Sequence, residues 1–87
     1  MSENIEEKRK RLVFRSWHRG TREIDLILGR FADAHLAEFS AEQLAEYDEF
    51  LSNSDPDIFN WISAKESVPA NKNSELISEI MKFFKTA

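Results

Sequence analysis

Residues 12–31 read LVFRSWHRGTREIDLILGRF and contain two helical patterns separated by a glycine. After Gly20 the apolar positions recur at helical spacing: Ile24, Ile27, Leu28, Phe31 and, just beyond the stretch, His35. Residues three and four apart share one face of a helix, so the pattern predicts a helix over residues 22–37. A preceding helix is predicted over residues 4–18. We expect Gly20 to end it, because glycine readily adopts the left-handed conformation common at that position.

Gly29 within the second helix indicates a close helix crossing. Three more helices are predicted downstream. Ser40 and Gln43 form a capping box that starts the third. The sequence Asp55-Pro56-Asp57 starts the fourth, with Asp55 as the cap and proline at the first helical position. After a polar linker over residues 65–73, the last helix carries apolar residues at Leu76, Ile77, Ile80, Met81, Phe83 and Phe84.

These elements predict an all-α protein, a compact five-helix bundle that forms a single domain over residues 1–87. Residues 1–7 are expected to be a flexible N-terminal arm. Strands are not expected, since no run alternates strictly between apolar and polar residues.

The composition argues against most kinds of catalytic or metal site. The chain has no cysteine, which excludes disulfides, thiolate zinc sites and cysteine nucleophiles. His18 and His35 are too far apart in sequence to form a metal-ligand pair on one helix. The acid pairs Asp55/Asp57 and Asp48/Glu49 are explained by helix starts and a solvated helix face. We therefore expect no catalytic residue, no metal and no bound cofactor.

Charge is distributed unevenly along the chain. Residues 8–30 contain eight basic and two acidic residues, whereas residues 31–64 contain eight acidic residues and no Lys or Arg. Such asymmetry can steer a docking partner. The basic run with Phe14 and Trp17 nearby also suggests a nucleic-acid surface. The acidic net charge of −4 opposes phosphate, so we expect no nucleic-acid partner. No apolar run is long enough for membrane insertion.

The segment Arg19-Gly20-Thr21-Arg22-Glu23 lies at the predicted corner between the first two helices. It offers an arginine fork, a carboxylate and a bare backbone that another molecule can approach. The same residues also fit a helix-ending glycine flanked by solvated charges. The residues alone support the two interpretations equally.

This segment has the form Arg-Gly-x-x-Glu, and there the chain resembles the succinate dehydrogenase flavinylation factors. The similarity covers roughly residues 11–62. Residues 12–31 resemble the first two helices of that family. Phe39-Ser40 with Glu42, Tyr47 and Leu51 resembles its third, and Asp55 to Trp61 matches its Asp-Pro-Asp-hydrophobic-x-x-Trp segment.

The resemblance implies an assembly chaperone that binds the flavoprotein subunit of succinate dehydrogenase, and a fumarate reductase flavoprotein as a further client. It implies that FAD becomes covalently attached to a histidine of the client, so the cofactor belongs to the client. The implied partner-binding residues are Arg19, Gly20 and Glu23, with Arg22, Asp25, Arg15 and Asp57 added as neighbours. We expect a cytoplasmic monomer, or a protein of the mitochondrial matrix if the chain is a trimmed eukaryotic form.

Two other functions remain open at this stage. One is a helical interaction module of antitoxin type that uses the same surface for an unrelated client. The other is a small nucleic-acid-binding bundle, which salt-dependent oligonucleotide binding would reveal.

Overall fold

Helix starts are set by side-chain caps in this protein, whose computed structural model describes residues 3–72 and 75–86. Asn4 with Glu7 and Ser40 with Gln43 form capping boxes, and Thr21 and Ser54 each accept a backbone N–H of the first turn. In chain order the elements are α1 (Ile5–Trp17), α2 (Arg22–His35), a 3₁₀ turn (Leu36–Glu38), α3 (Ala41–Leu51), α4 (Asp55–Ile62) and α5 (Glu75–Thr86). The described residues contain no strand, which confirms the all-α prediction.

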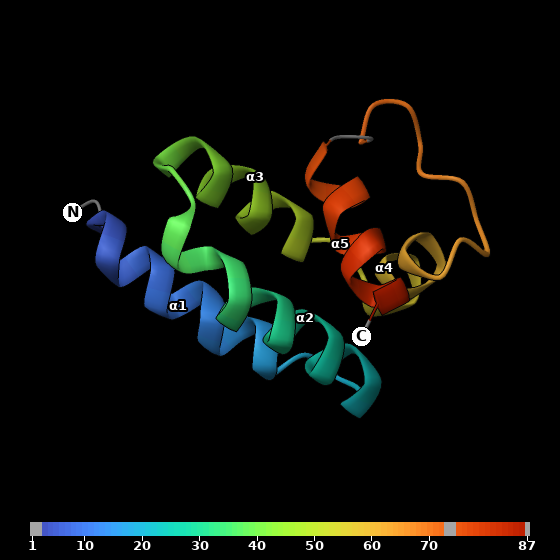
Figure 1. The fold of residues 1–87 in the computed structure, drawn as a ribbon, viewed down its shortest axis with the longest axis horizontal. Helices are drawn as coiled ribbons and strands as arrows, with labels where there is room; N and C mark the ends of the chain where they lie inside the picture. Colours follow the sequence, from blue (N-terminus) through green and yellow to red (C-terminus); the bar gives the residue numbers. More distant parts are fainter. Residues whose placement is uncertain (1–2, 73–74, 87) are drawn as a thin grey trace.

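The helices form one compact body. α1 and α2 lie side by side as an antiparallel hairpin, α3 crosses beside them, and α4 and α5 pack together at the far end (Figure 1). The Cα radius of gyration is 12.3 Å. A single domain of this length is expected to have a radius of about 12 Å. This agreement fits the five-helix bundle predicted from the sequence.

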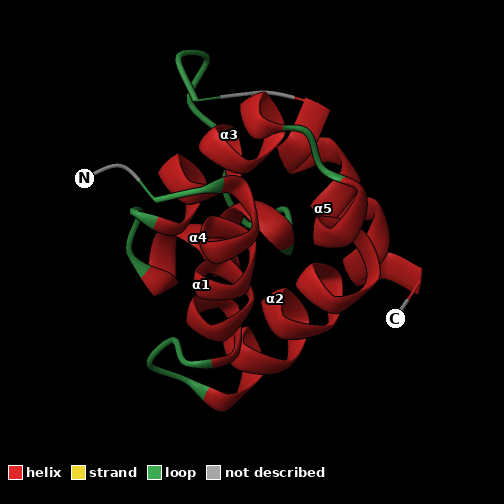
Figure 2. Cartoon of the chain, turned by 90° about the vertical axis from the view of Figure 1, so that its left-hand side faces the viewer, coloured by secondary structure: helices red, strands yellow, loops and turns green. Residues whose placement is uncertain are grey.

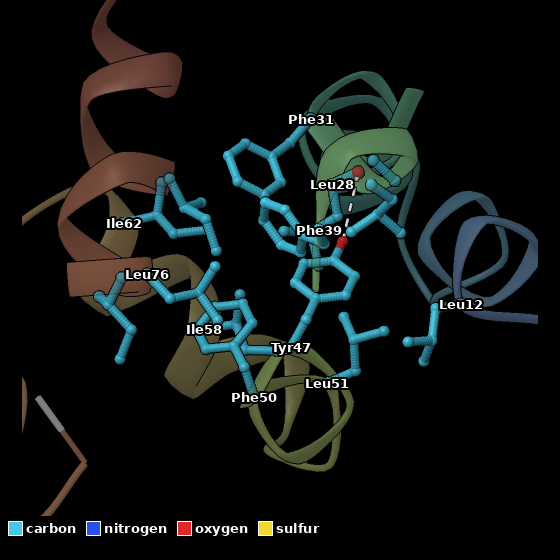
Figure 3. Packing of buried hydrophobic residues seen from close by; sticks show 14 of the residues in the cluster. Leu12, Leu28, Phe31, Phe39, Tyr47, Phe50, Leu51, Ile58, Ile62 and Leu76 are labelled. Carbon is cyan, nitrogen blue, oxygen red and sulfur yellow. Dashed lines mark hydrogen bonds between the residues drawn. The ribbon is translucent and has the colours of Figure 1, made fainter. Parts of the chain in front are cut away.

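The core is built around an aromatic cluster centred on Tyr47. Phe31 stacks on Tyr47 at a centroid distance of 5.9 Å, Phe50 stacks at 6.3 Å, and Phe39 makes an edge contact at 6.4 Å (Figure 3). Every helix contributes at least one buried residue to the surrounding core. Aromatic residues of α2, of α3 and of the segment between them therefore fix the position of the α1–α2 hairpin on the rest of the bundle.

Several predicted helix ends need correction. α2 stops at His35 rather than residue 37, because the chain tightens into the 3₁₀ turn. Ser54, not Asp55, caps α4; its hydroxyl accepts the Asp57 N–H, and Asp55 becomes the first helical residue. Gly20 is not left-handed, since Ala64 is the only described residue with positive φ. It does lie just beyond α1, as predicted.

The chain termini and the linker follow the sequence only in part. Residues 5–7 of the expected N-terminal arm form the first turn of α1, whereas residues 1 and 2 lie outside the described part. The flexibility of the arm stays a prediction. The polar linker is a loop as far as residue 72, and its last predicted residue is not described. None of the helices in the described ranges is long and apolar enough to cross a membrane.

Candidate docking site

The Arg-Gly-x-x-Glu segment forms the tight corner between α1 and α2. α1 ends at Trp17, and Thr21 caps α2 by accepting the Ile24 N–H at 3.3 Å. Arg19 and Gly20 therefore lie in the connecting loop, drawn green at the bottom of Figure 2, and Glu23 lies in the first turn of α2. Two helix ends thus fix the corner on both sides.

The side chain of Arg19 points inward. Its Nε donates to Asp55 Oδ1 at 2.9 Å, and its terminal nitrogens donate to the carbonyl oxygens of Leu51 at 2.7 Å and Asn53 at 3.0 Å. Only 10% of the side chain is exposed. A guanidinium at the C-terminal end of α3 satisfies carbonyls that lack helical partners and opposes the negative end of the helix dipole. Arg19 therefore ties the corner to the α3–α4 junction.

Two carboxylates hold the backbone of the corner. The Arg19 N–H donates to Asp25 Oδ1 at 2.6 Å, and the Gly20 N–H donates to Asp55 Oδ2 at 2.9 Å. A Cβ on residue 20 would lie 3.0 Å from Asp55 Oδ2, which is tighter than an ordinary contact. A side chain at position 20 would therefore press on this carboxylate, and no left-handed conformation is involved.

Arg15, another predicted partner-binding residue, also makes an internal contact. Its guanidinium donates to Asp48 Oδ1 at 3.3 Å and to the Leu51 carbonyl at 3.5 Å. Asp48 also forms ion pairs with two other residues of α1: its Oδ2 lies 3.0 Å from Arg11 Nη2 and 3.9 Å from Lys8 Nζ. Much of the predicted basic surface thus joins α1 to α3. Hydrogen bonding to Arg11 also lowers the pKa of Glu3, which lies on the same cluster.

Three of the predicted residues differ from these because their side chains face solvent. Arg22, Glu23 and Asp57 are exposed. None of their side chains forms a hydrogen bond or ion pair with another residue of the ranges 3–72 and 75–86. The structure therefore divides the seven predicted residues. Arg19, Gly20 and Asp25 build the corner, Arg15 joins α1 to α3 away from it, and the other three carry charges that a partner can pair.

An apolar groove of about 510 Å³ runs along α1 and is closed on its other side by the C-terminal end of α2 and the 3₁₀ turn. Phe14 on its edge is 65% exposed and stacks on His18 at 4.0 Å. Trp17 also lines the groove, and its indole N–H donates to Asp33 Oδ1 at 3.3 Å. The sequence placed Phe14 and Trp17 together near the basic run, and the structure confirms that they share one surface.

Sequence reasoning missed the role of Asp55 in the corner. Its place before proline predicts a helix cap. Its two oxygens instead bind Arg19 and Gly20, which lie 36 and 35 residues away. One signal in the sequence points to this role. Ser54 is also a good cap residue, so the carboxylate of Asp55 is not needed as the cap and is available for another contact. The described residues hold no cluster of three or more potential metal-binding side chains.

Residues 10–84 match the sequence profile of the family described as flavinator of succinate dehydrogenase. The chain belongs to this family. This confirms the resemblance seen in the Arg-Gly-x-x-Glu segment. It also favours the assembly-factor interpretation over a helical module with an unrelated client.

Individual members of the family cover nearly the whole chain. Succinate dehydrogenase assembly factor 2, mitochondrial, of Kluyveromyces lactis is 39% identical over 87 residues, covering 95% of this chain and 53% of the relative. The protein of the same name from Dictyostelium discoideum is 42% identical over 73 residues, covering 84% and 52%. Assembly factor 2-A of Drosophila yakuba is 36% identical over 88 residues, covering 99% and 54%.

The chain thus spans about half the length of the curated relatives it matches. All three relatives are named as mitochondrial proteins. The compartment of this chain stays a prediction.

Proposed function

We propose that this protein is an assembly chaperone that binds the flavoprotein subunit of succinate dehydrogenase and promotes the covalent attachment of FAD to it. The family match over residues 10–84 carries the proposal. The chain itself performs no catalytic step, acts as a monomer and holds no cofactor stably, because the FAD belongs to the client. A fumarate reductase flavoprotein is a second client of the same kind.

The corner between α1 and α2 supports the proposal physically. Arg22 and Glu23 are exposed, lie in the first turn of α2 and have no described partner, so both charges are free to pair across an interface. The corner that precedes them is fixed by hydrogen bonds that Arg19 donates to the Leu51 carbonyl of α3 and to Asp55 of α4. Charges that are desolvated on binding and held on rigid elements are typical of residues that dominate binding energy. Glu23, the acidic residue of the motif, is the contact we expect to matter most.

Binding promotes the reaction by shifting the client between conformations. A helper that binds one client conformation more tightly raises its population by that difference in affinity. The favoured conformation holds the client histidine close to the flavin, and proximity lowers the barrier to bond formation. This role requires a specific surface and no reactive group on the chaperone.

A flavinylation assay tests the proposal. Purified apo flavoprotein subunit is mixed with FAD and a dicarboxylate, with and without this protein, and covalent flavin is read by fluorescence on a denaturing gel. The wild-type chain should accelerate flavinylation. Glu23→Gln, which removes one interface charge, should reduce the acceleration at limiting chaperone by about tenfold or more.

The matched control is Glu79→Gln on α5, which removes the same charge from another exposed helical position. It should retain wild-type acceleration, and circular dichroism should show both variants folded. If the wild type gives no acceleration with a competent client, the flavinylation proposal is wrong. Equal loss in both variants would show that net charge, rather than the corner, governs docking. The same assay with a fumarate reductase flavoprotein decides the wider client range.

A further inference from the structure

Asp55 bridges the side chain and the backbone of the two adjacent corner residues. Its Oδ1 accepts from Arg19 Nε and its Oδ2 from the Gly20 N–H, both at 2.9 Å. The side chains of Asp55 and Arg19 are only 18% and 10% exposed. Asp55 is the first residue of α4, so this one carboxylate joins the start of α4 to the loop between α1 and α2.

Loss of this carboxylate would free both partners at once. The Arg19 guanidinium would keep only its two carbonyl acceptors, on Leu51 and Asn53. The Gly20 N–H forms no other hydrogen bond among the described residues. A glycine without a backbone hydrogen bond samples more conformations than any other residue. The corner would then lose its fixed geometry on the side that faces α4.

We propose that Asp55 is a positioning residue for client docking, acting through Arg19 and Gly20. The proposal rests on the proposed function. In it the arginine of the Arg-Gly-x-x-Glu motif is an internal brace and not a contact to the client. Asp55 holds the α1–α2 corner against α4, so that Glu23 after the corner and Asp57 in the first turn of α4 are presented in a fixed relation.

The expected effect is on affinity and not on the bound state. Only free chaperone whose α1–α2 corner has the client-binding geometry can bind. The apparent affinity is therefore the intrinsic affinity multiplied by the fraction of molecules in that geometry. Once the client has bound, it selects that corner, so the flavinylation rate at saturating chaperone stays the same. A residue that only stabilises the fold would not give this separation of affinity from maximal rate in a chain that is still folded.

The test variant is Asp55→Asn, whose single carbonyl oxygen can accept from Arg19 or from Gly20 but cannot serve both as the carboxylate does. The matched control is Asp48→Asn, which breaks the ion pairs between α1 and α3 away from the corner. Both variants remove one partly buried carboxylate that binds arginine. Both are measured at a temperature at which circular dichroism shows them folded.

Two measurements are made on each variant. The first is the NMR signal and hydrogen-exchange rate of the Gly20 amide, which needs no client. Asp55→Asn should shift this amide upfield and speed its exchange, and Asp48→Asn should leave it unchanged. The second is the Kd for the apo flavoprotein subunit with the flavinylation rate at saturation. Asp55→Asn should raise Kd about tenfold, corresponding to a corner competent about one-tenth of the time, and leave the saturating rate unchanged.

Each contrary outcome has a distinct meaning. An unchanged Gly20 amide in Asp55→Asn would overturn the brace itself, whatever the client does. If the wild type binds and Asp55→Asn has the same Kd, the positioning role alone is overturned. An equal rise in Kd for Asp48→Asn would overturn it as well. A wild-type chain that does not bind the flavoprotein subunit would overturn the proposed function, and the positioning role with it.

Discussion

The hydroxyl of Tyr47 occupies a fully enclosed place in the core. Tyr47 and Ser16 both have no exposed surface, and their oxygens are 2.6 Å apart. Ser16 Oγ donates its one hydrogen to the Leu12 carbonyl at 2.7 Å, so the tyrosine must donate to the serine. A longer contact, 3.5 Å, reaches the Leu28 carbonyl (Figure 3). An ionised Tyr47 would lose the proton that it donates to Ser16, and burial raises the pKa of its hydroxyl.

This raised pKa predicts alkaline destabilisation. An unfolded tyrosine ionises near pH 10, so above about pH 10 the unfolded chain binds fewer protons than the folded one. The contribution of Tyr47 is thus complete below that pH. Above it, stability falls by up to about 1.4 kcal/mol per pH unit. Urea unfolding from neutral to alkaline pH measures the slope.

Tyr47→Phe is the control for this titration. At neutral pH it should cost about 1 kcal/mol through the lost hydrogen bond. Above pH 10 its stability should fall less steeply than that of the wild type, because lysine titration is common to both chains. Parallel curves would mean that Tyr47 ionises in the folded state as easily as in the unfolded state.

At the scale of the helices, the crossing of α1 and α2 depends on one missing methyl group. A Cβ on Gly29 would lie 2.5 Å from Trp17 Cε2 and 2.6 Å from its Cε3, inside contact distance. The indole of α1 thus packs directly on the backbone of α2. The sequence predicted a close crossing at Gly29, and the structure confirms it and identifies Trp17 as the partner.

Gly29→Ala sets two effects against each other. Alanine gains about 1 kcal/mol in helix propensity, but overpacking against an aromatic ring costs about 1–3 kcal/mol. We expect a net loss of stability and a shift in tryptophan fluorescence. In a Trp17→Ala background the clash is gone, so the same substitution should stabilise by about 0.5–1 kcal/mol. A double-mutant cycle by urea unfolding measures this change of sign, and the same sign in both backgrounds would contradict it.

The difference between the predicted and observed elements follows from the range of the interactions. Helix starts at Ser40 and Thr21 depend on partners within three residues, so local sequence gives them accurately. The exposure of Glu23 also follows from helical periodicity, because Ile24 and Leu28 occupy the buried face. Local interactions of this kind are sufficient to predict five helices and the outward charges of the corner.

The direction of Arg19 required information that no local pattern contains. Its three acceptors lie on Leu51, Asn53 and Asp55, in the α3–α4 junction. Only the tertiary packing of the α1–α2 hairpin brings that junction to the corner. The family resemblance assigned the motif arginine to the partner interface, whereas its guanidinium bonds within the chain. Direct contact of Arg19 with a partner stays a prediction of that resemblance, and the bracing role proposed above is the alternative to it.

At the scale of the whole molecule, α5 closes the core. Leu76, Ile77 and Ile80 are buried, and Phe83 meets Phe31 of α2 edge to face at 5.6 Å. α5 also packs on α3 and α4, so it contacts three of the four preceding α-helices. The terminal phenylalanine pair, Phe83 and Phe84, is half-buried against the core. A chain this short has a total stability of only about 4–13 kcal/mol.

This arrangement predicts that the bundle unfolds as one unit. Ile80→Ala removes a fully buried side chain and should cost about 2–5 kcal/mol. Native-state hydrogen exchange measures where the loss is felt. The most protected amides of α2 should lose the same free energy of opening as those of α5, because neither helix keeps a complete core alone. Lys82→Ala, at an exposed position of α5, should leave both groups unchanged. If only the α5 amides lost protection, α5 would be a separately opening helix, and the docking corner would be insulated from mutations at the far end of the bundle.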